Sequence, residues 1–170
     1  MKRSNLKIAI LSFATLFISA NAFALPMAGE EVTMGDVWSA PYMMTDADDH
    51  VYQSFCLESE KFFVPGETYT VHSVGDYASG PALSPGGVEV DIDYLDEKTK
   101  WLYGAFASGV FSGLSDAGHK VQRAIWHLEG ERYGDVDDWN YLNNNYTIAD
   151  TGWNVFAVNI TKDGYDNQSQ

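Results

Sequence analysis

Cys56 is the only cysteine among the 170 residues, and its thiol is the side chain in this sequence most capable of covalent chemistry. A thiolate is a strong nucleophile and a metal ligand, whereas a buried thiol behaves as a small apolar group. The histidines (His50, His72, His119 and His127) show no metal-binding spacing together with Cys56, so we expect no metal ion or other cofactor. Three roles stay open for Cys56: a buried filler, a link to another chain, or a sulfur that reacts with something other than a cysteine.

The first 24 residues have the pattern of a secretory signal peptide. A basic start (residues 2–7) precedes a mostly apolar run (residues 8–18), and Ala22-Phe23-Ala24 is a small-x-small cleavage signal. We therefore expect residues 1–24 to be removed on export and residues 25–170 to form one domain. The expected location is extracellular, at the cell surface or periplasmic.

Charge excludes several classes of partner. Cleavage after residue 24 removes three of the 10 basic side chains and none of the 24 acidic ones, which leaves 146 residues with a net charge of −17. Such a chain is repelled by phosphate backbones and by anionic lipid, so nucleic acid is not an expected partner. No second apolar run is long enough to insert in a membrane after cleavage. In an exported, oxidising setting cysteines normally pair, and the single Cys56 cannot form an internal disulfide.

The periodicity of apolar residues changes twice along the chain. Strand patterns come first and last, and a pair of helical patterns lies between them. The expected strands are 31–38, 50–58, 68–74, 88–92 and 153–160, the expected helices are 94–110 and 116–129, and 39–49, 75–87 and 131–145 are expected connections. For the second helix, Ser115 or Asp116 is the candidate N-cap and Gly130 the expected stop. This order predicts an α+β domain, a β-sandwich or barrel with a helical insertion.

Two short segments stand out when they are considered together. Phe55-Cys56-Leu57-Glu58 ends an expected strand, and Gln122-Arg123-Ala124-Ile125-Trp126 lies in the second expected helix. They resemble the paired motifs of the Cys–Gln thioester domains, also called TQXA domains, of secreted bacterial surface proteins. In that family an aromatic-Cys-aliphatic segment is followed by Gln-x-Ala-Ile-Trp on a later element. The longer segment of residues 122–131, QRAIWHLEGE, is most similar to the variant in Gram-negative bacteria.

The resemblance implies an internal thioester between Cys56 and Gln122. A thiolate attacks a primary carboxamide, expels ammonia and leaves an acyl sulfur, which an incoming Lys amine or hydroxyl can then displace. Because an amide carbon is a poor electrophile, the two groups must be held at near-attack distance on rigid elements. The implied function is a surface adhesion module that binds its target covalently. It makes one bond rather than turning over, so we expect no enzyme activity.

Helix geometry suggests which residues could assist. At 100° per residue Gln122 lies at the border of the apolar stripe, where it faces a crevice without being exposed. Trp126, one turn later, could shield the bond from water, or simply pack in the core. His119 could accept the thiol proton and Glu129 could serve the departing nitrogen. For His119 and Glu129 we favour the ordinary alternatives, an exposed helix histidine and a solvated residue near the helix end.

Other features allow a second class of function. Acidic clusters at residues 46–49, 91–96 and 135–138 contain possible Ca²⁺ ligands, but their spacing is not that of a helix–loop–helix site, and solvated loops are the favoured interpretation. Aromatic residues between 139 and 146 could stack on sugars or anchor a loop. The alternative to the adhesion module is therefore a noncovalent extracellular binding or structural domain with Cys56 as a buried thiol.

The end of the chain departs from the family that the two motifs resemble. After Asn159 the sequence reaches Gln170 without a cell-wall sorting motif and without an apolar segment followed by a basic tail. We therefore expect either a released protein or a fragment cut within its last strand. This leaves the anchoring of the protein open, but not the pairing of Cys56 with Gln122.

Overall fold

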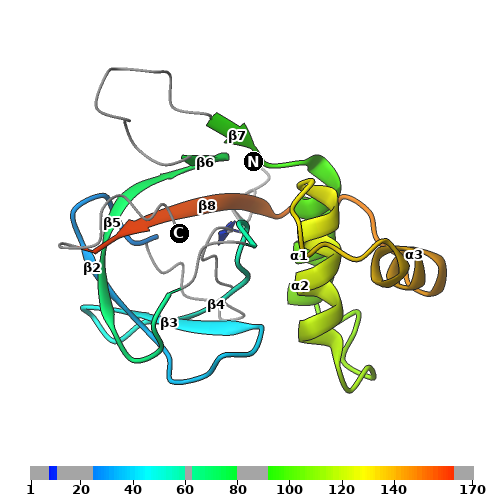
Figure 1. Cartoon of the computed structure of the whole chain (residues 1–170), viewed down its shortest axis with the longest axis horizontal. Coiled ribbons are helices and arrows are strands. Elements are labelled where there is room, and N and C mark those ends of the chain that lie inside the picture. Colours follow the sequence, from blue (N-terminus) through cyan, green and yellow to red (C-terminus); the bar gives the residue numbers. More distant parts are fainter. Residues whose placement is uncertain (1–7, 11–24, 60–62, 80–91, 163–170) are drawn as a thin grey trace, which may run out of the picture.

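Strands and helices segregate in space as they do along the chain. The computed structural model describes residues 8–10, 25–59, 63–79 and 92–162, with a curved sheet on one side and the helices packed on the other (Figure 1). The strands are β1 (Ile8–Ile10), β2 (Glu31–Met34), β3 (Tyr42–Asp46), β4 (Val51–Ser54), β5 (Thr68–Gly75), β6 (Tyr77–Ser79), β7 (Ile92–Tyr94) and β8 (Asn154–Thr161). The helices are α1 (Glu97–Ala107), α2 (Ala117–Leu128) and α3 (Val136–Asn145).

The main sheet has the strand order β1-β8-β5-β2-β3-β4, and β6 pairs with β7 in a separate ladder. Neighbours from β8 to β4 are antiparallel, and β1 joins β8 in parallel. The expected α+β class is confirmed. A sandwich or barrel is not shown, because within the described residues the sheet is open, with β1 and β4 at its edges. Apart from β1, the segment expected to be a signal peptide lies outside the described residues.

Most expected elements are confirmed, but three stretches expected to be connections contain secondary structure. The prediction of a loop over residues 131–145 was wrong, because α3 occupies most of it. Asp135 caps that helix by accepting from the N–H groups of Asp137 and Asp138, and Leu142 is fully buried. β3 and β6 also form within expected connections. The acidic residues that suggested a loop before β4 lie at the end of β3 and in the turn that follows. The expected strand 88–92 falls mostly outside the described residues, and β7 begins at Ile92.

The position of α2 is fixed at both of its ends. At its start, a Cβ on Gly118 would lie 2.1 Å from the carbonyl oxygen of Ala40, so only glycine permits this approach to the segment before β3. At its end, Gly130 has a φ of 76°, and its N–H bonds the His127 carbonyl while the N–H of Glu131 bonds the Trp126 carbonyl. This is a Schellman motif, and the expected stop at Gly130 is confirmed.

One core joins the sheet to the helices. Fully buried side chains come from β2, β3 and β8, from the segment after β4, and from all three helices. They include Met34, Met44, Phe55, Leu102, Ile125, Leu142 and Val158. Because the segment after β4 and helix α2 contribute to the same core, residues near position 56 and residues of α2 are brought into direct contact.

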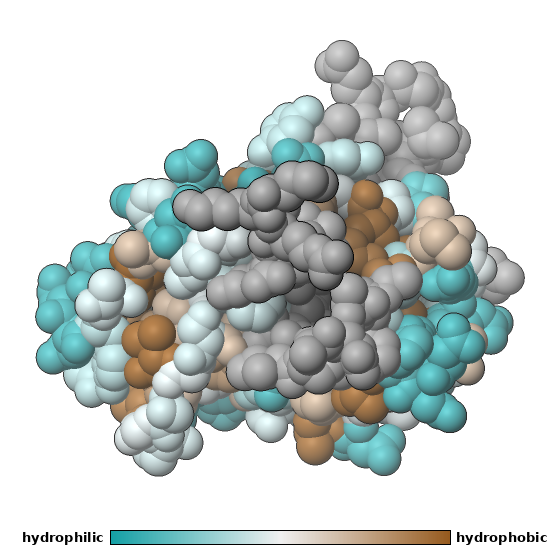
Figure 2. All heavy atoms as spheres, turned by 180° about the vertical axis from the view of Figure 1, so that it is seen from behind, coloured by the Kyte–Doolittle hydropathy of each residue, from teal (hydrophilic) through white to brown (hydrophobic). Residues whose placement is uncertain are grey.

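On the face opposite to the view of Figure 1, the described residues form no single large apolar area (Figure 2). Hydrophilic side chains gather at both margins, and apolar side chains are scattered between them (Figure 2). Scattered exposed apolar residues are normal on a protein surface. Of the helices described, none has both the length and the apolar character that crossing a membrane requires.

Candidate functional site

Cys56 and Gln122 meet in the interior, although 66 residues separate them in sequence. The backbone N–H of Cys56 donates to Oε1 of Gln122 at 2.8 Å, and Nε2 of Gln122 donates to the carbonyl of Cys56 at 2.6 Å. Both residues are only 3% exposed. The carboxamide therefore pairs with the backbone of Cys56 much as a neighbouring strand would, and both polar ends of the amide are satisfied away from water.

Aromatic packing holds the Cys56 segment from the side of α1. Phe55 is fully buried and makes edge-to-face contacts with Phe106 and Tyr103, with ring centroids 4.9 Å and 5.8 Å away. The hydroxyl of Tyr103 donates to the carbonyl of Gln53 at 3.0 Å, which ties the end of β4 to the same helix. Cys56 follows two residues after β4 and is held on rigid elements rather than on an exposed loop.

Gln122 is held by the apolar face of α2. Val121, Ala124 and Ile125 are completely buried, so the helix cannot rotate about its axis without exposing them. The expectation that Gln122 is not exposed is confirmed, and it lies deeper than the border position that helix geometry suggested. Helix α2 thus places the carboxamide of Gln122 at a buried position, where an apolar side chain would be usual.

The thiol of Cys56 has a defined orientation. Its Sγ donates to the carbonyl oxygen of Glu58 at 3.0 Å. The carboxamide of Gln122 meanwhile contacts the backbone of the same residue. The N–H of Cys56 already polarises the Gln122 carbonyl, and a donor at that oxygen stabilises the negative charge that develops when a nucleophile attacks the amide carbon.

The three residues considered as helpers lie in different surroundings. Trp126 is half-buried, and within the described part of the chain its indole N–H is buried without a hydrogen-bond partner. His119 is exposed and lines a surface pocket of about 610 Å³ together with Pro41 and Phe106. Glu129 accepts a hydrogen bond from the backbone N–H of Asp96 at 3.2 Å, at the start of α1. His119 therefore agrees with the ordinary interpretation of an exposed helix histidine, whereas Glu129 is half-buried and bonded to α1 rather than simply solvated.

Sequence reasoning missed Glu131, although it is the last residue of the QRAIWHLEGE segment. Its Oε2 accepts hydrogen bonds from the backbone N–H of Ser59 at 2.8 Å and from the Ser59 hydroxyl at 2.9 Å. Ser59 is 1% exposed and lies three residues after Cys56. The chain from Cys56 to Ser59 and the QRAIWHLEGE segment are thus joined twice, at residues 56 and 122 and at residues 59 and 131.

Sequence reasoning also missed Tyr42, the first residue of β3. Tyr42 pairs with Ser54 in the β3–β4 ladder and packs edge-to-face on Phe63 at 4.8 Å. Burial, followed by the negative charge of a Cys56 thiolate nearby, raises the pKa of Tyr42 to about 12. Its phenol therefore stays protonated at neutral pH. No periodicity in the sequence could have indicated this neighbour, because the pairing of β3 with β4 creates it.

The acidic clusters are used in turns and caps. Asp46 accepts hydrogen bonds from the backbone N–H groups of Asp48 and His50, from the His50 ring at 2.9 Å and from the Tyr52 hydroxyl. Burial opposes the ionised form of Asp46, but these hydrogen bonds outweigh it and lower the pKa of the carboxyl. Among the described residues, no three or more His, Cys, Asp or Glu are arranged to hold a metal ion.

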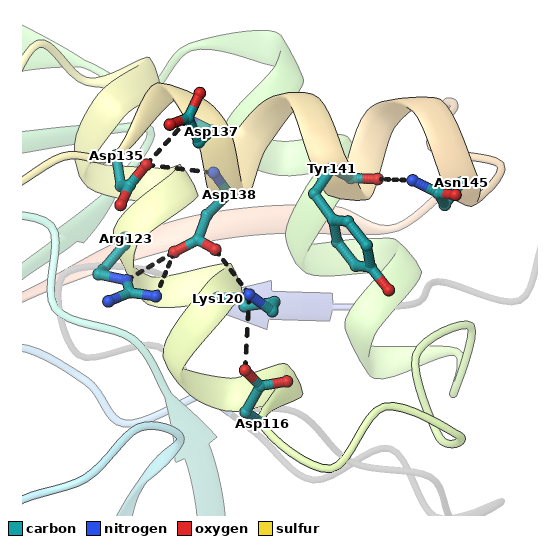
Figure 3. A network of polar contacts seen from close by, with 8 residues as sticks. All are labelled: Asp116, Lys120, Arg123, Asp135, Asp137, Asp138, Tyr141 and Asn145. Atoms are coloured by element: carbon teal, nitrogen blue, oxygen red, sulfur yellow. Dashed lines mark hydrogen bonds and ion pairs between the residues drawn. The ribbon is translucent and has the colours of Figure 1, made fainter.

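A charged network joins α2 to α3 on the side of α2 away from Cys56. Asp138 points from α3 between Arg123 and Lys120, with contacts of 2.5 Å and 2.9 Å (Figure 3). Lys120 also reaches Asp116 at 3.5 Å. The hydrogen bond with Asp138 is the main cause that raises the pKa of Lys120. The network fixes α3 on α2, and so supports the helix that carries Gln122.

Comparison with known proteins adds no relative. No family model, no curated protein and no solved structure matches this chain. The function must therefore be argued from the two motifs and from the geometry of the residues that they contain.

Proposed function

We propose that the chain is an exported adhesion module in which Cys56 and Gln122 form an internal thioester that captures an amine or hydroxyl on a target. The observation that carries the proposal is the reciprocal hydrogen-bond pair between the Gln122 carboxamide and the Cys56 backbone. This pair supports the proposal because it holds the unreactive amide of Gln122 next to Cys56, the one cysteine of the sequence. Both residues are buried, so water is largely kept from the site.

The proposed reaction conserves all atoms without an oxidant or cofactor. Sγ of Cys56 attacks Cδ of Gln122 from the position that its hydrogen bond to the Glu58 carbonyl defines, while the Cys56 N–H stabilises the negative charge on Oε1. The C–N bond of the amide breaks as the C–S bond forms. The thiol proton goes to the departing nitrogen, which leaves as ammonia. A target amine or hydroxyl later displaces the sulfur, restores the thiol and keeps the acyl group as an amide or ester.

The proposal fits an exported surface protein of bacterial type. A thioester is hydrolysed by water, and burial of Cys56 and Gln122 would protect the bond from this reaction.

The whole domain that we propose is a β-sandwich or barrel with the helices as an insertion. The curvature of the sheet supports this architecture (Figure 1). Because the reaction consumes the bond, each chain acts once and is not an enzyme.

The alternative is a noncovalent binding or structural domain in which the same contact is only a buried bridge. One observation favours it: both polar ends of the Gln122 amide are satisfied by the Cys56 backbone, and the thiol is bonded to Glu58. A structural glutamine would have the same contacts. The two proposals differ in one covalent bond, which mass distinguishes.

Intact mass of the purified chain tests the proposal. The wild type should be lighter than its sequence by one ammonia, about 17 Da, whereas Cys56→Ser and Gln122→Ala should have their full sequence masses. A full-mass wild type contradicts the proposal unless peptide mapping finds Glu at position 122, the product of thioester hydrolysis.

A further inference from the structure

A single peptide group connects the Cys56 thiol to Glu131. The carbonyl of the Glu58–Ser59 peptide accepts from Sγ of Cys56 at 3.0 Å, and the N–H of the same peptide donates to Oε2 of Glu131 at 2.8 Å. Hydrogen bonds at the two ends of one peptide group polarise each other, so the carboxylate strengthens the carbonyl as an acceptor. The position of Sγ therefore depends on Glu131, which does not touch it.

Glu131 is itself fixed by the helix that carries Gln122. Its backbone N–H closes the end of α2 by bonding the Trp126 carbonyl at 2.7 Å. Its carboxylate takes a second hydrogen bond from the Ser59 hydroxyl, in a place where Ser59 is almost completely buried. Hydrogen bonds to a carboxylate are shorter and stronger than those between neutral groups.

Gln122 on α2 and Glu131 directly after α2 thus hold the Cys56 segment at two points. Gln122 binds the backbone of Cys56, and Glu131 binds the peptide group that receives the Cys56 thiol. We propose that Glu131 is a positioning residue for the thioester, which sets through the Glu58–Ser59 peptide the position from which Cys56 attacks Gln122. This inference rests on the proposed function.

The test is the rate of ammonia loss during refolding. Chains denatured before the bond forms start at full mass, and intact mass then follows the loss of about 17 Da with time. Glu131→Ala should slow the loss about tenfold or more, because the carboxylate no longer holds the peptide. Glu131→Gln, which keeps an acceptor oxygen at the same reach, should remain within about threefold of the wild type. Ser59→Ala, which keeps the backbone N–H, is the matched control and should change the rate by no more than about twofold.

Refolding must be measured separately, because a purely structural residue would also affect stability. Circular dichroism should show that the variants are folded before most of the ammonia is lost, and rescue by Glu131→Gln separates positioning from folding. Where Glu131→Ala does not fold, Glu131→Asp is the test of the inference. Its carboxylate is shorter in reach by one methylene, so the rate of ammonia loss should fall by about threefold to tenfold.

The outcomes separate the inference from the function on which it rests. Loss of ammonia at the wild-type rate in Glu131→Ala, or in Glu131→Asp where the alanine variant is unfolded, overturns the role of Glu131 and leaves the thioester standing. A wild type that folds and keeps its full mass overturns the proposed function, and the role of Glu131 with it.

Discussion

Two faces of the same helix use opposite chemistry. On one face of α2, Gln122 binds the backbone of Cys56 through neutral hydrogen bonds in a dry interior. On the other, Arg123 and Lys120 bind Asp138 of α3 through charged contacts near the surface (Figure 3). Because successive helix residues are 100° apart, neighbouring positions 122 and 123 serve different partners.

This difference predicts different responses to solvent. Charged contacts near the surface weaken as salt screens them, whereas neutral hydrogen bonds inside the core do not respond to ionic strength. The charged network holds the helices together, and the neutral contact joins the helices to the sheet. Variants that remove the charged network or the neutral contact, one at a time, therefore distinguish the contribution of α2 to stability from its contribution to the proposed reaction.

The largest effect should come from Gln122→Ala. The change removes the proposed cross-link and also the two buried hydrogen bonds between Gln122 and the backbone of Cys56. The 66-residue separation of the cross-linked positions corresponds to a contribution of roughly 4 kcal/mol as an upper guide. The loss of the two hydrogen bonds between Gln122 and the Cys56 backbone adds about 1–3 kcal/mol for each bond. Thermal unfolding should show a large loss in melting temperature for this variant.

Cys56→Ala is the matched comparison. It removes the cross-link but keeps the two hydrogen bonds with Gln122, so its melting temperature should lie between those of the wild type and Gln122→Ala. The double variant should lose little more than Gln122→Ala alone, because the second change removes a bond that is already absent. Fully additive losses would count against a cross-link.

A smaller loss is expected from Asp138→Ala. It leaves Lys120 and Arg123 without their shared carboxylate, but both cations retain access to water, so the cost should be about 1–3 kcal/mol. Denaturant unfolding at low and high salt measures it, and high salt should reduce the difference from the wild type. Asp137→Asn, an exposed neighbour on α3, should be nearly neutral. An equal effect of the two changes would mean that the network does not hold α3.

The smallest effect is confined to alkaline pH. Burial raises the pKa of Tyr103 well above its usual value, and burial with the nearby Cys56 raises the pKa of Tyr42 to about 12. A raised folded-state pKa gives stability that is present below pH 10 and is lost as the pH rises towards 12 and beyond. The unfolding free energy should therefore fall in that window.

Tyr103→Phe identifies the residue responsible for part of this decline. It removes a titrating hydroxyl together with its hydrogen bond to Gln53, so the variant should be less stable at neutral pH but should lose less stability between neutral and alkaline pH. Tyr133→Phe, at an exposed tyrosine, should follow the wild type. A decline that is unchanged in Tyr103→Phe would assign the alkaline sensitivity elsewhere.

The elements with strong periodicity could be predicted from sequence. The apolar stripe of Val121, Ala124 and Ile125 and the stop at Gly130 predicted α2 to within a residue or two. Burial of one helix face requires apolar residues at helical spacing, and a left-handed C-terminal residue favours glycine, so both features can be recognised in the sequence. The sequence of α3 has a weaker helical pattern. Its asparagines and aspartates suggested a loop, and Asp135 turned out to be the cap of a helix that packing on α2 stabilises.

The site was only partly predictable for a related reason. Cys56 and Gln122 could be paired from their two motifs, but Glu131 and Tyr42 could not. Glu131 reaches Ser59 only because the chain reverses after α2, and Tyr42 approaches Cys56 only because β3 pairs with β4. Contacts between segments far apart in sequence depend on topology, which local patterns do not encode.

The reaction with methylamine, located by peptide mapping, tests the central claim most directly. If the thioester exists, methylamine should displace the sulfur, add about 31 Da to the wild-type mass and leave an N-methylamide on Gln122 with Cys56 as a thiol. Cys56→Ser should not react. A wild type at its full sequence mass, with Gln122 unmodified before and after methylamine, would contradict the account and favour a buried structural bridge.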